Sequence, residues 1–458
     1  MINKKNSLDM INGPIWNKLP LYAFPVAATA ILEQLFNASD IAVVGNFTGS
    51  GKTVAVAAVG ANTSIIALLV NFFIGISVGV NVVISNAIGR QDDETVKKSV
   101  HSSVKFSFLC GFVVLIVGEL VASPILSLLK VPEDVFPYAL LYLRIYLIGL
   151  PVIFLYNFVA AIFRSIGDTR TPLFALFFSG VLNVFLNLFF VAVLKMTVDG
   201  VATATVISNL ISSSILIYRL LKTETIIHLD FKDLKIDKVV INRIMKIGLP
   251  AGIQSAVFSI SNIVIQSAIN SLGTVVMAAS SAAYNIEIIA YDVLNSFSQA
   301  CTTFVGQNYG AGKIDRCKKT LLLSLIEDAI ASFITIVAIL FFGRRLLSIF
   351  NNDSSVISLG YTRLIIVFFA YIFSMLYEVL SGYLRGFGIS FVPALLTTLG
   401  VCGVRILWIN IAFPVKHDFS TIMLSYPISL SFTALLIFLC LIIYRPSKRF
   451  TPSITNQK

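Results

Sequence analysis

The chain has 458 residues, of which 57% are hydrophobic and only 12% are charged, and its formal net charge is +11. A soluble domain carries about 25% charged residues, so this composition excludes an ordinary soluble protein, and its hydrophobicity excludes a disordered one. Binding to nucleic acid would need a solvated basic face, which so few charges cannot supply around so much apolar surface. The composition therefore predicts a protein of the lipid bilayer with no nucleic-acid partner.

Apolar runs long enough to cross a membrane, which takes about 20 residues, follow one another along the chain. Six lie in the first half, at about 15–45, 54–86, 97–122, 136–162, 172–195 and 198–221. Six lie in the second half, at about 243–271, 274–306, 319–342, 357–384, 391–413 and 420–444. The fold class predicted is an all-α polytopic membrane protein with twelve transmembrane helices.

The most charged stretch of the chain separates the two sets of spans. It predicts an N-terminal lobe at 1–221, a cytoplasmic linker at 222–238, and a C-terminal lobe with a short cytoplasmic tail at 239–458. With a cytoplasmic N-terminus, 25 of the 34 lysines and arginines fall on the cytoplasmic side, eight fall outside, Arg363 among them, and Arg405 falls within a span. Because cytoplasmic loops carry an excess of these residues, we expect both termini in the cytoplasm.

The two halves resemble each other at one constant offset in residue number. Four residues of the run YNFVAAIFRSIGDTRTP recur in YEVLSGYLRGFGISFVP, namely Tyr156, Arg164, Gly167 and Pro172 as Tyr377, Arg385, Gly388 and Pro393. Since six spans is an even number, the second half enters the membrane in the same orientation as the first. The halves are therefore predicted to be two pseudo-symmetric six-helix lobes, related as parallel repeats, with a substrate site between them near the midplane.

Polar residues inside the first-half spans are the first candidates for function, because a charge at the bilayer centre costs about 2.5–3.5 kcal/mol on insertion scales. Spacings of four and three place Glu33, Asn37 and Asp40 on one face of the first span. An aspartate that faces amides can take up a proton or hold a cation such as a transient Na⁺; the alternative is a fixed hydrogen-bonded cluster. The residues predicted to surround this site are Asp40, Asn157, Asn183 and Asn187.

Polar residues of the second half form a separate stripe on the seventh, eighth and tenth spans. Carboxylates beside aromatic rings suit a lipophilic cation, which gains Coulomb attraction and cation–π contact. The alternative is that these groups only join helices, since amides and hydroxyls bond across spans without a ligand. The residues predicted to contact substrate are Glu33, Asn37, Gln266, Tyr284, Glu287, Tyr291, Asn295 and Glu378.

Several motifs point away from an enzyme. The five cysteines contain no CxxC pair and the three histidines are far apart, so neither disulfides nor a metal site is expected. The run NFTGSGKT at 46–53 lacks the first glycine of a phosphate-binding loop. No ordered His/Asp or Ser/His set stands at one depth. We therefore expect no enzyme and no cofactor, and transport that is driven by an ion gradient or is passive.

The runs LEQLFNASDIAVVGNF, YNFVAAIFRSIGDTRTP, YEVLSGYLRGFGISFVP and AAYNIEIIAYDVLNSFSQACTTFVGQNYGAGK resemble the multidrug and toxic compound extrusion (MATE) family, most of all its bacterial branch common in Gram-positive species. The resemblance implies two six-helix lobes around a central cleft and export of organic cations coupled to inward Na⁺ or H⁺. It also implies that Asp40 works with Asn157, Asn183 and Asn187. Asn187 stands where some members carry a second aspartate, and no acid aligns with the tenth-span aspartate of another branch.

The function predicted is a secondary active multidrug efflux transporter of the bacterial cell membrane, which exports cationic amphiphilic compounds by Na⁺ or H⁺ antiport through alternating access. Its partners are expected to be small organic cations and the lipid bilayer, and the protein is expected to be a monomer. Three alternatives stay open: a related flippase or exporter of a lipid-linked or anionic substrate, a passive channel, and a membrane enzyme. An anionic substrate would favour a basic cavity.

Overall fold

The computed structural model describes residues 7–48 and 52–449. The first-half helices are α1 (Lys18–Phe47), α2 (Lys52–Gly89), α3 (Asp93–Leu128), α4 (Phe136–Ser165), α5 (Arg170–Leu188), η2 (Phe189–Val193) and α6 (Val198–Lys222). After the short turn η3 (Phe231–Asp233) come α7 (Lys238–Asn270), α8 (Thr274–Gly310), α9 (Ile314–Phe350), α10 (Ser354–Gly386), α11 (Phe391–Thr397), η4 (Thr398–Gly403), α12 (Val404–Ile411), α13 (Phe419–Tyr444) and α14 (Pro446–Arg449). The predicted positions of the termini, and the middle of the 46–53 loop, lie outside the described residues.

These helices account for the twelve predicted spans once the runs broken by π-helical turns are joined. Helix α5 continues through η2, and α11 continues through η4 into α12. Within the described residues, eleven helical stretches are long and apolar enough to cross a membrane. Helix α8 is the one predicted span that is not among them, because it carries a polar stripe that includes Glu287 and Asn295. The prediction of an all-helical polytopic membrane fold with twelve helices is confirmed.

The internal repeat extends from the sequence to the backbone. Helices α9, α11 and α13 each begin at the same offset from the starts of α3, α5 and α6, as Ile314 does from Asp93. A π-helical turn interrupts both the fifth and the eleventh span, but at different positions, since η2 begins at Phe189 and η4 at Thr398. The turns that precede these two helices also match, since Gly167 has φ 84° and Gly388 has φ 82°. Both glycines are in the left-handed region that L side chains avoid, so the same turn chemistry ends the same helix in each half.

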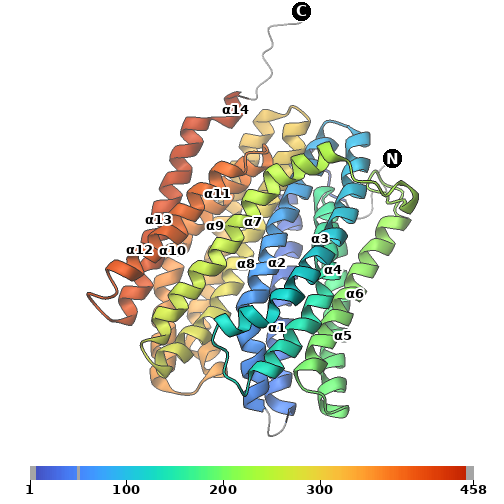
Figure 1. The fold of residues 1–458 in the computed structure, drawn as a ribbon. Helices are drawn as coiled ribbons and strands as arrows, with labels where there is room; N and C mark the ends of the chain where they lie inside the picture. The colour runs from blue at the N-terminus through green and yellow to red at the C-terminus, as the bar shows by residue number, and fades with distance from the viewer. Residues whose placement is uncertain (1–6, 49–51, 450–458) are drawn as a thin grey trace, which may run out of the picture. The chain divides into compact units, whose positions relative to one another are not determined.

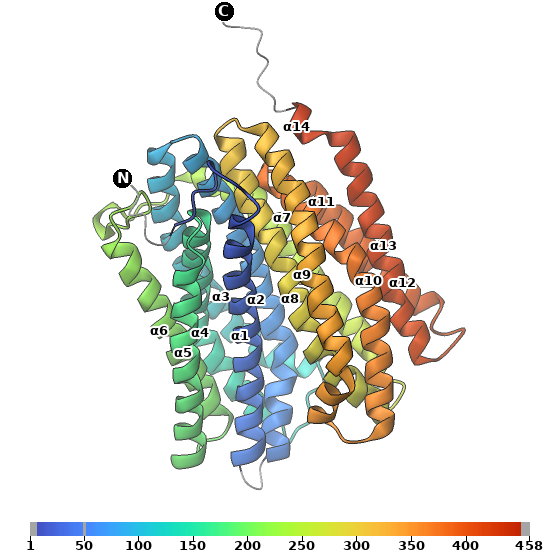
Figure 2. The same cartoon turned by 180° about the vertical axis from the view of Figure 1, so that it is seen from behind.

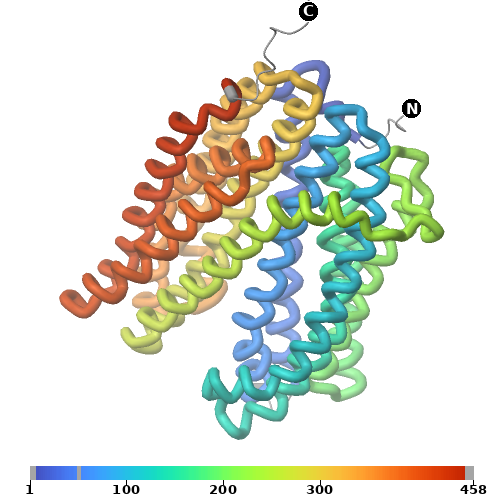
Figure 3. Tube along the Cα trace, turned by 45° about the horizontal axis from the view of Figure 1, so that its top comes forward, coloured from blue at the N-terminus to red at the C-terminus, as the bar shows by residue number. Residues whose placement is uncertain are grey.

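The described chain forms two compact units. Unit 1 contains Ala28–Ile84 and Asp92–Met245. Within it, α4 packs against both α3 and α6, and α5 packs on α6 (Figure 1). Unit 2 contains Asp9–Ala27, Ser85–Gln91 and the chain from Lys246 onward. Within it, α8, α9 and α10 pack on one another, and α10 also contacts α13 (Figure 2). The short turn at 311–313 joins α8 directly to α9 (Figure 3).

Helix α1 belongs to both units, because the division falls between Ala27 and Ala28. Pro25 lies inside the helix just before that point. Proline has no backbone N–H and its ring clashes with the preceding turn, so an interior proline kinks or weakens a helix. The start of α1 is fixed within unit 2, where the Tyr22 hydroxyl and Thr303 Oγ1 are 2.8 Å apart.

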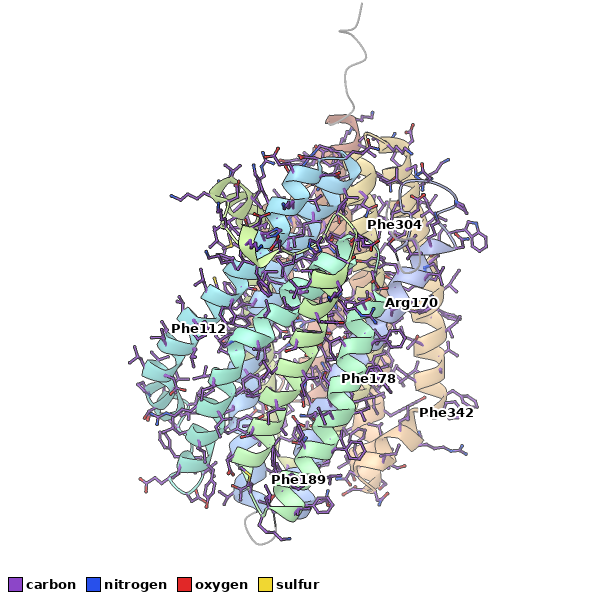
Figure 4. All side chains as sticks on the ribbon, turned by 90° about the vertical axis from the view of Figure 1, so that its right-hand side faces the viewer. Phe112, Arg170, Phe178, Phe189, Phe304 and Phe342 are labelled. Atoms are coloured by element: carbon purple, nitrogen blue, oxygen red, sulfur yellow. The ribbon has the colours of Figure 1, made fainter. Side chains whose placement is uncertain are left out.

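Large apolar side chains cover the outer faces of the helices. In unit 1, Phe112 on α3, Phe178 on α5 and Phe189 in η2 are all exposed at the surface (Figure 4). A soluble monomer rarely exposes a contiguous apolar patch of more than a few hundred Å². Rows of exposed phenylalanine and leucine on helices of this length are what contact with lipid tails requires.

The charged stretch 222–238 packs on the start of α3, inside unit 1. Lys97 Nζ lies 2.7 Å from Asp233 Oδ2, and the Asp230 backbone N–H donates to His101 Nε2 at 3.0 Å. The hydrogen bond from Lys97, together with its charge, lowers the pKa of Asp233. This segment is therefore held to one helix by specific polar contacts.

Candidate cation-coupling site

Asp40 is a buried carboxylate on α1, only 6% exposed, and its partners come from α5 and α6 of the same unit. Asn187 Nδ2 donates to Asp40 Oδ1 at 2.5 Å. Thr205 Oγ1 lies 3.0 Å from Asp40 Oδ2, where its hydroxyl donates. Each oxygen of the carboxylate is thus held by one neutral donor. The face of α5 that carries Asn187 turns inward, since it also buries Leu176, Ser179 and Asn183.

Asn183 completes the cluster one helical turn before Asn187. Its Oδ1 accepts from Asn187 Nδ2 at 3.1 Å, and its Nδ2 lies 3.4 Å from Thr205 Oγ1. Asn187 Oδ1 is buried and has no hydrogen-bond partner among the described residues. A buried oxygen that accepts no hydrogen bond costs folding free energy. This oxygen is therefore available to bind a cation or a hydrogen-bond donor. Carboxylate, amide and hydroxyl oxygens are the ligands that hard cations prefer.

No lysine, arginine or histidine of the described chain forms an ion pair with Asp40. A buried unpaired carboxylate costs several kcal/mol of free energy, which binding of a proton or a small cation removes. The described residues contain no group of three or more His, Cys, Asp or Glu side chains that could hold a metal ion. One carboxylate with neutral amide and hydroxyl groups beside it is a set that a proton or a small hard cation can occupy.

The structure brings together Asp40, Asn183 and Asn187 but not Asn157. Asn157 is half-buried, and its Nδ2 donates to Ile153 O within α4 at 3.0 Å. Thr205 takes the place that sequence reasoning gave to Asn157. Thr205 carries no sequence signal of its own, since it is one of several small polar residues in the run GVATATVIS.

The other residues predicted on α1 lie apart from this cluster. Glu33 is partly buried and lies within electrostatic range of Arg164 on α4. Asn37 is exposed. Neither has a hydrogen bond to Asp40 among the described contacts.

In unit 2, Glu287 is occupied by a buried arginine. Arg363 Nη2 and Nε each lie 2.9 Å from Glu287 Oε2, and the Tyr371 hydroxyl donates to Oε1 at 3.3 Å. Arg363 was counted with the positive charges of the outer side, and the structure corrects this, because Arg363 is buried within α10 and is 2% exposed. The partner acid, 76 residues earlier in the chain, lets the arginine be buried. The charge of Glu287 is thereby neutralised.

The remaining candidates of unit 2 do not form one cluster. The Tyr291 hydroxyl donates to Glu378 Oε1 at 3.1 Å, and both side chains lie within the α8–α10 packing. Asn295 Oδ1 accepts from Gln299 at 2.8 Å. Gln266 is exposed and donates to Asn270 one turn away, and Tyr284 is 43% exposed.

Comparisons with known proteins agree with this fold. The family model described as MatE matches residues 25–189 and again 250–409, so the same model fits both halves. The probable multidrug resistance protein YoeA of Bacillus subtilis is 26% identical over 435 residues, which cover 93% of each chain. The probable multidrug resistance protein YpnP of Bacillus subtilis is 27% identical over 389 residues, covering 83% of this chain and 84% of that relative.

A solved structure shares the fold. It is described as the outward-facing conformation of a multidrug resistance MATE family transporter of the MOP superfamily, with a TM-score of 0.89 and 19% identity. The likeness covers 99% of this chain and 100% of that one. Because the family model matches well over half of the residues, in two copies that follow the internal repeat, the chain belongs to the MatE family of membrane transporters.

Proposed function

We propose that this protein exports amphiphilic drugs across the bacterial cell membrane by alternating access, and that Na⁺ or H⁺ binding at Asp40 drives the cycle. The observation that carries the proposal is the geometry of Asp40, a buried carboxylate held by two neutral donors with an unpartnered amide oxygen beside it. The relatives described as probable multidrug resistance proteins support the substrate class. Cationic amphiphiles are the substrates that we propose first.

Alternating access requires that the occupant of Asp40 change the relative stability of two states. A ligand shifts a conformational equilibrium only by its differential affinity for the two states. Asp40 on α1 is bonded to α5 and α6, so a proton or cation that displaces Asn187 or Thr205 changes contacts between three helices at once. Binding of the coupling ion can therefore change how the helices of unit 1 pack.

We also propose that the protein works as a monomer with both termini in the cytoplasm. The excess of lysine and arginine on one side supports this orientation. The proposed inter-lobe linker, 222–238, then lies at the cytoplasmic surface, with 1–221 and 239–458 as the two transport lobes.

The experiment is drug efflux by purified protein in vesicles on which either a Na⁺ gradient or a pH gradient alone is imposed. Wild-type protein should move a cationic dye uphill with one of these gradients, and Asp40→Asn should lose most of that flux. Ser214→Ala is a matched control, because Ser214 is an exposed α6 residue whose hydroxyl donates to Leu210 O of its own helix.

Two results would overturn the proposal. Undiminished gradient-driven efflux by Asp40→Asn would remove Asp40 from the coupling mechanism. Downhill conductance of the dye or ion by the wild-type protein, without uphill flux under either gradient, would instead identify a passive channel.

A further inference from the structure

Arg405 is a second buried arginine of unit 2, and its environment differs from that of Arg363. It lies on α12 directly after the π-helical turn η4 and is 5% exposed. Its Nε donates to Ser429 Oγ on α13 at 3.1 Å. Its guanidinium carbon lies 4.3 Å from the centre of the Tyr426 ring, also on α13. The side chain is therefore fixed by one hydrogen bond and one cation–π contact.

The positive charge of Arg405 has no acidic partner among the described residues. Arg363 shares the same Tyr426 ring, at 5.4 Å, but its charge is balanced by Glu287 at 2.9 Å. Arg405 forms no ion pair within the described chain. Tyr426 thus lies beside two guanidinium groups and one carboxylate, which leaves one positive charge in excess.

The end of the Arg405 side chain keeps unused donors. Nη1 and Nη2 donate to no atom of the described residues, whereas all three guanidinium nitrogens of Arg363 do. Some polar atoms of the described residues are fully covered and have no partner, for example Arg385 Nε. Nη1 and Nη2 of Arg405 are not among these covered atoms, so both reach accessible space. Two parallel N–H groups of a guanidinium match the two oxygens of a carboxylate or phosphate. An anion therefore fits both the charge and the geometry of these donors.

The repeat gives an independent argument. At the offset that relates the halves, Ser261 stands in place of Asp40 and Tyr426 in place of Thr205, and Arg405 is the counterpart of Val184. In unit 1, residues of α5 and α6 bond to a buried acid of α1; in unit 2, a buried base lies on α12, in the span equivalent to α5, and bonds to α13, the equivalent of α6. The same framework therefore carries opposite charges in the two halves.

We propose that Arg405, stacked on Tyr426, is an anion-binding subsite that accepts the carboxylate or phosphate of a transported amphiphile. This inference rests on the proposed function and extends its substrate class from cations to amphiphiles that also carry an anionic group. The Tyr426 ring packs on the guanidinium group, and the hydrogen bond from Nε to Ser429 fixes the orientation of that group. Nη1 and Nη2 then donate hydrogen bonds to the anion.

The test compares two dyes that differ in one group, a rhodamine with a free carboxylate and the methyl ester of the same rhodamine. Uptake is measured in phosphatidylcholine vesicles containing the full-length protein under the gradient that drives export. Arg405→Gln should lower transport of the acid by about tenfold or more, since a charge-assisted bidentate contact is lost, and should leave transport of the ester unchanged. Arg405→Lys should recover part of the acid transport.

Arg344→Gln is the matched control, because Arg344 also lies over a tyrosine ring, at 5.1 Å, but is exposed. It should transport both dyes as the wild type does. An equal loss of both dyes in Arg405→Gln, or no loss of the acid, would overturn the inference. Inhibition of acid transport by added phosphatidylglycerol in the wild type but not in Arg405→Lys would assign the site to a lipid headgroup and also overturn it. Failure of the wild type to move even the ester would contradict the proposed function instead.

Discussion

The side-chain amide of Asn187 donates to the carboxylate of Asp40 at 2.5 Å, across 147 residues of chain. This bond joins α5 to α1 inside unit 1 and fixes the carboxylate that we propose to be the coupling group. Since Asn187 Oδ1 has no partner among the described residues, the same side chain both restrains the acid and offers it a second oxygen.

Thr205→Val is expected to weaken ion coupling while leaving the shape of the site nearly unchanged. The substitution removes the donor 3.0 Å from Asp40 Oδ2, and a hydrogen bond to a charged group contributes about 1.5–3 kcal/mol. The ion concentration for half-maximal efflux should therefore change by about tenfold or more. Thr205→Ser, which keeps the hydroxyl, should behave as the wild type, and equal behaviour of the valine and serine variants would contradict the role of Thr205.

Asn157→Ala is expected to leave ion dependence unchanged, although resemblance to the family places Asn157 in the coupling cluster. Its amide bonds to Ile153 within α4 and makes no described contact with Asp40. Asn187→Ala should shift the ion dependence strongly in the same assay. A shift for Asn157→Ala as large as that for Asn187→Ala would show that the cluster rearranges to include α4 during transport.

Glu287→Gln is expected to destabilise the protein rather than to act on substrate selectivity. Removing one partner of a buried ion pair costs about 3–5 kcal/mol, because the other charge is left unpaired. Here the charge left without a partner is that of Arg363, which is 2% exposed. The Tm of the purified protein should fall clearly, and replacing Arg363 by methionine in the same protein should restore part of it. An unchanged Tm together with lost efflux of cations would instead favour a direct substrate role for Glu287.

Asp418 is expected to give a stability contribution that disappears in acid. It caps the start of α13, and hydrogen bonds from Thr421 together with the charge of Lys416 lower its pKa from 3.8 to about 2. A group with a lowered folded-state pKa stabilises the fold above its unfolded pKa, and this stability is lost as the pH falls through the folded value. The Tm difference between wild type and Asp418→Ala should be constant above about pH 5 and should vanish towards pH 2. A difference that persists at pH 2 would mean that the charge of Asp418 contributes nothing.

Hydropathy and the constant offset between the halves were sufficient to predict the helical spans and their repetition. The span at 274–306 was predicted despite its polar stripe because its apolar run between breaks is long enough to cross a membrane. The spacing of Asn183 and Asn187 places both on one face of α5, so Asn187, a partner of Asp40, and its neighbour Asn183 could be predicted.

The rest of the site depends on pairing between distant helices, which a single sequence does not encode locally. Thr205 has no spacing partner that would distinguish it from Thr203. Arg363 has the same charge whether it is exposed in a loop or buried in α10, and only the approach of Glu287 makes burial possible. For the same reason, hydropathy could not show that Arg405 lacks an acid.

The π-helical turn η4 also decides how the span that contains Arg405 responds to a change in length. A π-helical turn holds one residue more than regular α-helical spacing allows, and each residue of an α-helix turns the chain by about 100°. Deleting one residue between Thr398 and Gly403 would therefore remove the surplus residue and leave Arg405 on the face that meets Tyr426. A single-codon deletion within the regular helix α11 would instead rotate Arg405 away from Tyr426 without altering any residue on α13 itself.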